Sequence, residues 1–530
     1  MPQSRHITHS GRPASDRHDI VDAQHDIEDE LATSVELIHR HQTTKHGVYV
    51  GAPGLLLMDW TIMDVVRNLR DSHGDAIIAP KVNLYSWFPF QKPTSGSRTA
   101  FLETDVGAAA LILISDLRDG HLDVKGGTDR SRASAILLRE AVQVAVDGDD
   151  AKDDDGCEVL YGRAGLLYTL LFLRAETHAR RRETAEQEIP PDAFVTIVEQ
   201  LCHDQNIAAL VDEIVTRGRR GARQYAMEAR SRDRSVGRAP PLMWSWHGKR
   251  YLGSAHGVAG ILQMLVSVPS HILKQHWEPI IHTVQWLVDV QDSSTGNWTH
   301  KASRDLLEPS SHATVTDDHA MVQWCHGASG ILILFSALLS RRQHVGATLE
   351  IPESLDSAMR SSLALGAKLI YERGLLRKGV GLCHGVAGSV YALLAASDVL
   401  DKPPSHSNQP VQDSKRVRAT RSRSQQYRDQ HLPDGHRSEL TERQWLLRAF
   451  HLAHLATSYR KFTLRGEMRS PDRQASLFEG LAGMCCAWAE ILRRMEDIMV
   501  QGNSDGIFDA EGVEWRRRRG VPGYDDLPLW

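Results

Sequence analysis

Two short motifs of the same composition could supply ligands for a metal ion. They are Cys325-His326-Gly327 and Cys383-His384-Gly385, far apart in the chain. Two thiolates and one imidazole suit Zn²⁺, and three protein ligands leave its fourth position open, as in catalytic zinc sites. The alternative is that each cysteine is an inert, buried side chain at a helix start. The matched pair favours a metal centre, provided that the motifs meet in space.

A Gly-x-x-Gly pattern followed by an apolar run recurs along the chain. Clear copies begin at Gly51, Gly162, Gly257, Gly327, Gly385 and Gly480, and a degenerate copy lies around Gly107. One copy is a weak signal, but several copies that each open an apolar segment indicate repeated structure. The glycines permit a tight turn and a close approach of the backbone, after which a helix begins. Both Cys-His motifs stand at the start of such a copy.

Apolar and amphipathic segments alternate along this repeat. The runs after Gly165 and Gly330 are apolar on nearly every side, which predicts helices buried against several neighbours. Between copies, Leu355, Met359 and Leu363 form one stripe of an amphipathic outer helix. The pattern therefore predicts an all-α chain with two layers of helices. A closed ring, or α/α toroid, would bring distant copies together as the metal site requires, and an open solenoid is the alternative.

The predicted organisation is one toroid domain over residues 30–500. A flexible polar leader is expected at 1–29, without the apolar segment of a secretory signal, and a tail is expected at 501–530. Long gaps between copies predict two insertions. The first, at 174–238, is rich in Arg and Glu with a helical centre. The second, at 401–437, is a Ser-, Arg- and Gln-rich stretch with little to bury.

The composition is that of a soluble globular protein. Of 530 residues, 41% are hydrophobic and 24% are charged, and 62 Lys and Arg nearly balance 67 Asp and Glu. This balance gives no reason to expect nucleic acid as a partner. Apolar runs such as Ile331–Phe335 are too short to span a bilayer. Six cysteines do not make a disulfide scaffold, so we expect reduced thiols in a cytoplasmic protein.

Taken together, the motifs resemble those of the lanthionine synthetase C-like family, specifically its eukaryotic, glutathione-binding branch. The resemblance is carried by Tyr161-Gly-Arg-Ala-Gly165, Ala255-His-Gly-Val-Ala-Gly260, Trp324-Cys-His-Gly327, Lys378-Gly-Val-Gly-Leu-Cys-His-Gly385 and Phe478-Glu-Gly-Leu-Ala-Gly483. It runs from about residue 46 to residue 494, which is most of the chain. It implies an α/α toroid of seven inner and seven outer helices. It also implies one zinc ion per chain, bound by Cys325, Cys383 and His384.

The resemblance further implies a chemistry. A zinc-bound thiol has a lowered pKa and is thiolate at neutral pH. Bacterial relatives add a peptide cysteine to dehydroalanine or dehydrobutyrine and close a thioether ring. Eukaryotic relatives bind glutathione and add it to dehydrated Ser and Thr residues in proteins, and some are linked to the plasma membrane as peripheral proteins. The implied partners are therefore glutathione or another thiol and a dehydrated peptide or protein.

Three further residues receive catalytic assignments from the family. His256 corresponds to the proposed acid that protonates the enolate, although a lone histidine at a helix start is more often structural. Glu158 lies where bacterial cyclases carry a catalytic aspartate and would serve as its charge partner or proton relay. An ordinary surface carboxylate is the alternative. Lys378 resembles a lysine near the glutathione thiol, where it would stabilise a thiolate or enolate, and a solvated loop lysine is the alternative.

The remaining assignments concern substrate binding. Arg163 and Glu479 occupy loop positions of two other copies and are expected to contact the charged ends of the tripeptide. His326 matches no family ligand and is placed beside the metal. Two features depart from the family. The second copy is degraded, with Glu103 and Thr104 before its one glycine, and the N-terminus shows no clear match for the basic residue that helps to hold glutathione in relatives.

Three functions compete for this pattern. The first is zinc-dependent addition of glutathione, or another thiol, to dehydroamino acids. The second is a non-catalytic glutathione- or partner-binding signalling protein on the same scaffold, but such a protein needs no acid like His256 beside a metal. The third is a carbohydrate-active toroid enzyme, which requires two opposed carboxylates at helix starts. The clear copies offer only Glu479 there, so we expect the first function.

Overall fold

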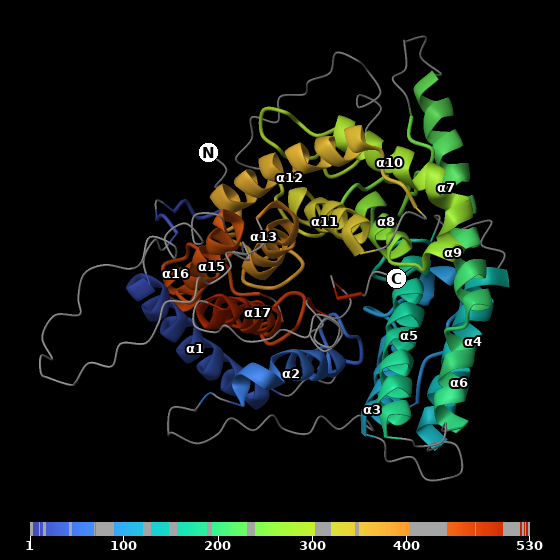
Figure 1. Cartoon of the computed structure of the whole chain (residues 1–530), viewed down its shortest axis with the longest axis horizontal. Coiled ribbons are helices and arrows are strands. Elements are labelled where there is room, and N and C mark those ends of the chain that lie inside the picture. Colours follow the sequence, from blue (N-terminus) through green and yellow to red (C-terminus); the bar gives the residue numbers. More distant parts are fainter. Residues whose placement is uncertain are drawn as a thin grey trace, which may run out of the picture.

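The computed structural model describes residues 4–9, 11–13, 17–41, 45–67, 69, 89–119, 129–147, 156–187, 193–230, 239–302, 320–344, 349–401, 443–471, 473–501, 520–521, 524 and 526–527. In these ranges the regular structure is helical, with isolated β-bridges and no strand (Figure 1). None of the helices described combines the length and the apolar composition needed to cross a bilayer. The prediction of an all-α chain is confirmed for the described residues.

One set of helices begins directly after the glycine copies, and we call them the glycine-start helices. They are α2 (Ala52–Val66), α3 (Asp105–Asp119), α5 (Arg163–Glu186), α8 (Val258–Val266), α11 (Ala328–His344), α13 (Val386–Leu400) and α17 (Leu481–Gln501). The helix α8 is buried along its whole length, as its apolar composition predicts. In chain order each glycine-start helix packs against the next, and α17 packs in turn against α2.

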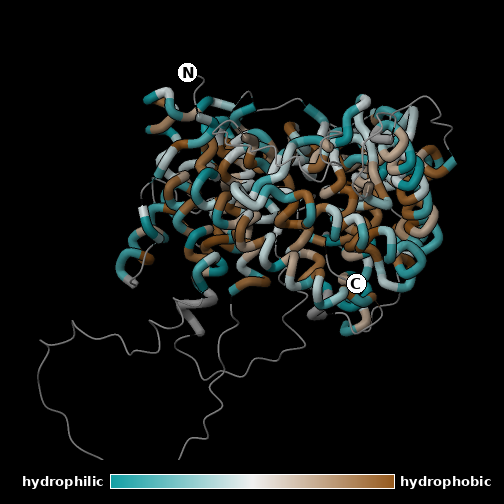
Figure 2. The backbone as a smooth tube through the Cα atoms, turned by 90° about the horizontal axis from the view of Figure 1, so that it is seen from above, coloured by the Kyte–Doolittle hydropathy of each residue, from teal (hydrophilic) through white to brown (hydrophobic). Residues whose placement is uncertain are grey.

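The other helices form an outer layer. They are α1 (Arg17–Arg40), α4 (Asp129–Asp147), α6 (Ala193–Leu201), α7 (Asp204–Arg230), α9 (Ser270–Leu273), α10 (Trp277–Asp289), α12 (Glu353–Arg373), α15 (Gln444–Ala456) and α16 (Tyr459–Leu464), with 3₁₀ turns η2 (Gly96–Arg98) and η3 (Lys274–His276). In Figure 1, α12 lies outside α11 and α13. The α12 helix is amphipathic as predicted, because it buries Met359 and Leu363 and exposes Lys368. Figure 2 shows the hydrophobic stretches inside this layered body.

The second glycine of each copy explains why the repeat needs glycine. A Cβ on Gly388 would lie 2.2 Å from the carbonyl oxygen of Leu382, six residues earlier, and the same contact recurs in every copy. The loop before each helix therefore folds directly onto the first turn of that helix. The degenerate copy keeps this feature, because a Cβ on Gly107 would lie 1.9 Å from the carbonyl oxygen of Phe101. It is thus a structural member of the repeat.

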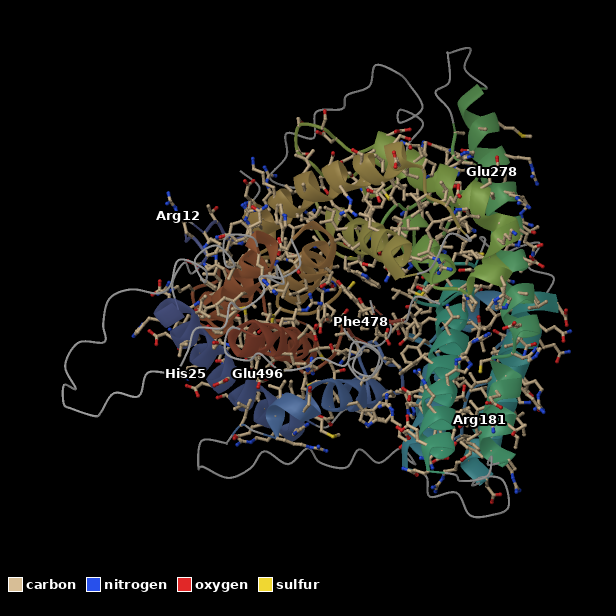
Figure 3. The ribbon with its side chains drawn as sticks, in the orientation of Figure 1. Arg12, His25, Arg181, Glu278, Phe478 and Glu496 are labelled. Atoms are coloured by element: carbon tan, nitrogen blue, oxygen red, sulfur yellow. The ribbon has the colours of Figure 1, made fainter. Side chains whose placement is uncertain are left out.

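Main-chain hydrogen bonds join the loops that precede neighbouring glycine-start helices. The N–H of Cys325 donates to the oxygen of Cys383 (3.3 Å), Cys383 to Phe478 (2.8 Å), Phe478 to Tyr49 (3.1 Å) and Tyr49 to Leu102 (2.9 Å). The series continues from Ala100 to Tyr161, Val159 to Ala255, and Ser254 to Trp324, at 3.1 Å each. Figure 3 places Phe478 amid the starts of these helices and Glu278 of α10 at the periphery. We call this series the inter-loop hydrogen bonds.

The N-terminal part of the chain differs from the expected leader. Helix α1 begins at Arg17, well before residue 30. Its apolar residues Ile20, Ile27 and Leu31 are spaced along one face and are buried, and α1 packs against α15 and α17. Residues 17–29 therefore belong to the packed body, since their burial against distant helices could not be inferred from local polarity.

The described residues of the first expected insertion and of the expected tail also differ from the prediction. Residues 174–186 continue α5, and residues 193–201 and 204–230 form α6 and α7, which pack against α5 and α4. Residues 402–437 of the second expected insertion lie outside the described residues. In the expected C-terminal tail, Tyr524 and Asp526 are buried. The described parts of the first expected insertion and of the expected tail therefore contribute to the packed structure.

The close contact at the second glycine yields a prediction for stability. We expect Gly388→Ala to lower the free energy of unfolding by about 3 kcal/mol, because its Cβ overlaps a backbone oxygen that cannot move away without displacing a loop. The measurement is urea denaturation. Ser389→Ala is the matched control on the next residue, since this buried hydroxyl has no hydrogen-bond partner in the described part of the chain. Equal stability of Gly388→Ala and the parent chain would contradict this account of the repeat.

Candidate functional site

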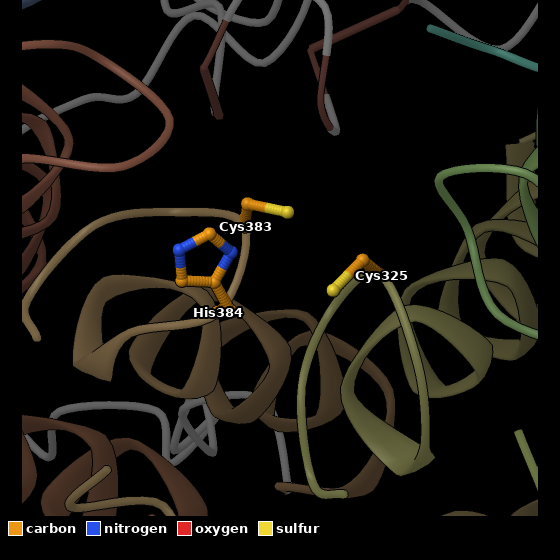
Figure 4. A group of neighbouring side chains, drawn as sticks. All are labelled: Cys325, Cys383 and His384. Atoms are coloured by element: carbon orange, nitrogen blue, oxygen red, sulfur yellow. The ribbon is translucent and has the colours of Figure 1, made fainter. Parts of the chain in front are cut away.

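Two loops bring together three side chains with metal-binding atoms. The sulfurs of Cys325 and Cys383 and a ring nitrogen of His384 all lie within 4.8 Å of one another. In Figure 4 both sulfurs project into the space between the loops that precede α11 and α13. Both cysteines are buried, and His384 is half-buried. The inter-loop hydrogen bond from Cys325 to Cys383 holds these two loops side by side.

This group could hold a metal such as zinc. Burial raises the pKa of the Cys383 thiol well above its ordinary value, and the neighbouring Cys325 raises it further. A cation between the two sulfurs would supply the missing positive charge and reverse this effect. Two sulfurs and one imidazole are a donor set that Zn²⁺ accepts, and a fourth position would remain for another ligand. The chemistry of the residues therefore fits the ion.

His326 lies next to this group without belonging to it. Its ring packs 5.2 Å from that of Tyr251, and its buried Nδ1 has no hydrogen-bond partner among the described residues. The pKa of His326 is lowered to about 4, first by burial and then by the neighbouring side chains of His256, His300, Lys378 and His384. The ring is therefore uncharged at neutral pH.

Half-buried His256 and buried Glu158 form a pair at the loops before α8 and α5. His256 Nδ1 lies 2.9 Å from a carboxylate oxygen of Glu158, which is 2% exposed. Glu158 also accepts the N–H groups of Leu160 (2.8 Å) and Tyr161 (2.6 Å). This burial excludes the ordinary surface carboxylate that was the alternative for Glu158. Because the carboxylate accepts Nδ1–H, it sets the orientation of the ring and leaves Nε2 for chemistry.

The His256 ring is also held by aromatic neighbours. It stacks on Trp246 with ring centroids 5.7 Å apart and an angle of 5° between the planes. The ring of Tyr161 is nearly parallel to both, with its centroid 5.8 Å from that of Trp246 and 6.5 Å from that of His256. Tyr251 lies 5.9 Å from His256 and also touches His326, so it connects the pair to the neighbourhood of the cysteines.

Glu103, in the degenerate copy around Gly107, lies close to the His256–Glu158 pair, a position that the sequence did not predict. The pKa of Glu103 is raised to about 7, first by burial and then by the carboxylates of Glu479 and Glu158. Arg98 and His256 lower it in part. The carboxyl groups of Glu103, Glu158 and Glu479, which come from three different loops, are therefore close enough to interact electrostatically.

Tyr49 was also missed. Burial raises the pKa of Tyr49 well above its ordinary value, and a hydrogen bond with Cys383 contributes. Its ring stacks on Phe478 with centroids 4.8 Å apart. Tyr49 therefore borders the sulfur side of the metal group.

Register within the copies is the signal that would have identified these residues. The residues four positions before the second glycine are Val50, Glu103, Tyr161, His256, His326, His384 and Glu479. The residues five positions before it are Tyr49, Leu102, Leu160, Ala255, Cys325, Cys383 and Phe478. Since every loop folds onto its helix in the same way, equivalent positions face a common region, and most of the polar residues of the site occupy them.

Lys378 and the N-terminus lie together near His326. Lys378 is exposed and contributes to the lowered pKa of His326. The N-terminal segment runs beside it, because Arg377 N–H donates to the carbonyl oxygen of Arg5 (3.0 Å). Arg5 also contributes to the lowered pKa of nearby His300. A basic N-terminal residue is therefore present here, although the sequence analysis found no clear match for it.

Arg163 has a different environment from the expected one. It is completely buried, and its guanidinium donates to the carbonyl oxygens of Ala145 (2.8 Å) and Gly156 (3.3 Å). Those bonds join α4 to the loop before α5. The side chain therefore stabilises the fold and is not accessible to a tripeptide, whereas Glu479 is half-buried beside Glu103 and Tyr49.

Comparison with known proteins gives one family. A family model described as lanthionine synthetase C-like protein matches residues 42–425. A protein of Danio rerio named glutathione S-transferase LANCL1 is 26% identical over 340 residues, which cover 63% of this chain and 59% of that protein. A protein of Arabidopsis thaliana named LanC-like protein GCL1 is 28% identical over 238 residues, covering 45% and 42%. The chain thus matches about half the length of these relatives.

The raised pKa of Glu103 predicts a pH-dependent stability. The folded chain binds this proton more tightly than the unfolded chain, whose carboxyl has a pKa near 4.5, so the free energy of unfolding falls as pH rises from 4.5 to about 7. We expect Glu103→Gln to remove this loss, a gain over the parent chain on the order of 1 to 3 kcal/mol at pH 7. Urea midpoints at pH 5, 6 and 7 measure it. The exposed Glu372→Gln is the control, and equal pH dependence in the Glu103→Gln variant would refute the assignment.

Proposed function

Because the chain belongs to the lanthionine synthetase C-like family, we propose that it is a zinc-dependent transferase that adds the thiol of glutathione to dehydroalanine and dehydrobutyrine residues of peptides or proteins. The observation that carries this proposal is the group of Cys325, Cys383 and His384, with the His256–Glu158 pair nearby. The printed name of the Danio rerio relative, a glutathione S-transferase, supports the choice of thiol. A bacterial-style cyclase would also need a dedicated precursor peptide.

The architecture proposed for this function is a double-layered α/α toroid. The glycine-start helices would form its inner layer and the amphipathic helices its outer layer. Two observations support closure, namely the packing of α17 against α2 and the inter-loop hydrogen bonds that run from each loop to the next. One zinc ion per chain would then lie at the end of the ring where the loops gather.

In the proposed reaction, zinc bound by Cys325, Cys383 and His384 would lower the pKa of the glutathione thiol. His256 would accept the thiol proton at Nε2, and Glu158 would stabilise the imidazolium through Nδ1–H. The thiolate forms a C–S bond at the β-carbon of the dehydroamino acid, and the carbon–carbon double bond becomes an enolate. His256 then returns the proton to the α-carbon. The net result is addition of one S–H across one double bond.

Charged residues would orient the tripeptide and the acceptor. Lys378 and Arg5 would face the carboxylates of glutathione, or the thiolate itself, because they bring positive charge to the side of the site near His326. Glu479, with Glu103, would face the ammonium group. In this arrangement the two ends of glutathione would lie on opposite sides of the site, and its sulfur would lie between them. A cytoplasmic location, with or without peripheral contact to a membrane, remains the expectation from the sequence.

Metal content tests the first step of the proposal. We expect about one zinc per parent chain, and loss of both zinc and thiol addition in Cys383→Ala, because two remaining ligands hold the ion poorly. The measurements are elemental analysis and mass spectrometry of a dehydroalanine peptide incubated with glutathione. Cys202→Ala is the control, since this buried thiol lies at the end of α6, remote from the site. Full zinc content in Cys383→Ala would overturn the ligand assignment, and zinc without thiol addition would favour a non-catalytic binding protein.

Proton transfer is tested separately from metal binding. We expect His256→Gln to keep its zinc and to lower kcat about 100-fold or more, because the thiol proton loses its carrier. We expect Glu158→Gln to shift the pH optimum, because an amide stabilises the imidazolium less well than a carboxylate. Initial rates between pH 5.5 and 9 provide both values. Unchanged kcat in His256→Gln would remove this residue from the mechanism.

A further inference from the structure

The described C-terminal residues lie inside the molecule. Val521 and Tyr524 are almost completely buried, and Asp526 is 6% exposed. We call Val521, Tyr524, Asp526 and Leu527 the C-terminal contact residues. They lie outside any helix, so their buried ring and carboxylate need partners from other elements. Those partners come from helices and loops throughout the fold.

The Tyr524 side chain touches the residue that precedes each metal-binding cysteine. Its ring stacks on Trp324, just before Cys325, with centroids 5.0 Å apart and planes at 24°. Its hydroxyl lies 3.5 Å from the carbonyl oxygen of Leu382, just before Cys383. The ring of Phe478, whose carbonyl accepts the Cys383 N–H, lies 6.2 Å away. A single side chain therefore contacts the loops before α11, α13 and α17.

The main chain of Tyr524 and the side chain of Asp526 are hydrogen-bonded to α8 and α5. The side-chain amide of Gln263 donates to the carbonyl oxygen of Tyr524 at 2.5 Å. The hydroxyl of Tyr168 donates to Asp526 at 3.0 Å. Both donors are buried. A cavity of about 120 Å³ remains beside this segment and is lined in part by Leu527. The backbone of Tyr524 and the side chain of Asp526 are thus held by α8 and α5, while the Tyr524 ring contacts the loops before α11, α13 and α17.

We infer that Tyr524 is a positioning residue for the metal centre, which holds the loops of Cys325 and Cys383 at the separation that lets both sulfurs reach one cation. Metal geometry tolerates small errors poorly, and groups that orient the ligands typically change metal affinity 10- to 100-fold when they are lost. The flat ring fixes Trp324 by stacking and packs against Phe478, whose carbonyl oxygen accepts the N–H of Cys383. This inference concerns metal affinity and does not depend on the proposed transferase reaction.

Zinc affinity of the full-length chain, measured by competition with a chelator in the absence of any thiol substrate, tests the inference. We expect Tyr524→Ala to raise the Kd for zinc about tenfold or more, because the two loops lose their common support. Tyr524→Phe keeps the ring and should change the Kd by less than about threefold, since its hydroxyl contacts are long. If Tyr524→Ala does not fold, Tyr524→Leu keeps the buried volume but not the flat ring, and we expect the same loss.

The control separates positioning from general loss of packing. Tyr225→Ala removes another buried tyrosine, from α7, where the ring faces Arg250. It should lower the Tm and leave the Kd for zinc unchanged. The inference is overturned if Tyr524→Ala binds zinc as tightly as the parent chain, or if Tyr225→Ala weakens zinc binding equally. A parent chain that binds zinc but adds no thiol would refute the proposed function and leave this inference intact.

Discussion

The inter-loop hydrogen bonds are the constraint on which the rest of the structure depends. They form between main-chain groups, so they are indifferent to side-chain identity and leave the side chains of each loop free to vary. The second glycine of each copy makes them available by letting the loop lie directly on its helix. Once every loop has this shape, the same register position always faces the same region. Cysteine, histidine, glutamate and tyrosine can then be placed there one loop at a time.

Electrostatics of the site follow from crowding titratable groups in a partly buried space. The thiol of Cys383 and the carboxyl of Glu103 both have raised pKa values, because burial penalises their charged forms and like neighbours add to the penalty. His326 shows the complementary effect, since burial, and then neighbouring histidines and Lys378, lower its pKa. The residues therefore favour uncharged forms on their own, and a cation at the sulfurs would change the balance for all of them.

Much of this arrangement was predictable from sequence, and the remainder was not for physical reasons. The glycine repeat and the apolar runs predicted an all-α chain, and the matched Cys-His motifs predicted that two thiolates and one imidazole meet. The family resemblance assigned the imidazole to His384, and the structure brings Cys325, Cys383 and His384 together. These signals can be read from the sequence because each lies within a short stretch and recurs along the chain. Arg163 occupies a conspicuous loop position, but its hydrogen bonds to Ala145 and Gly156 depend on how α4 packs, which no local pattern encodes.

The C-terminal residues and Glu103 illustrate two further limits. A tail was expected at 501–530, whereas the burial of Tyr524 depends on contacts with residues hundreds of positions away. Glu103 stood in a copy that had lost its first glycine, so the loss concealed a register position that the second glycine preserves. The family resemblance did not point to Tyr524 or to Glu103. The environment of each residue is set by packing against distant parts of the chain.

The bond from Phe478 to Tyr49 joins two loops near opposite ends of the chain. During synthesis the N-terminal loops emerge first, and the carbonyl oxygen of Tyr49 has to wait for the N–H of Phe478 until α17 and its preceding loop leave the ribosome. Contacts of such long sequence separation form slowly, because the intervening chain must first be ordered. The last segment to be translated thus completes a neighbourhood whose first member was made near the start. Closure between these two loops therefore has to wait until nearly the whole chain has been made, whereas neighbouring glycine-start helices can pack against each other earlier.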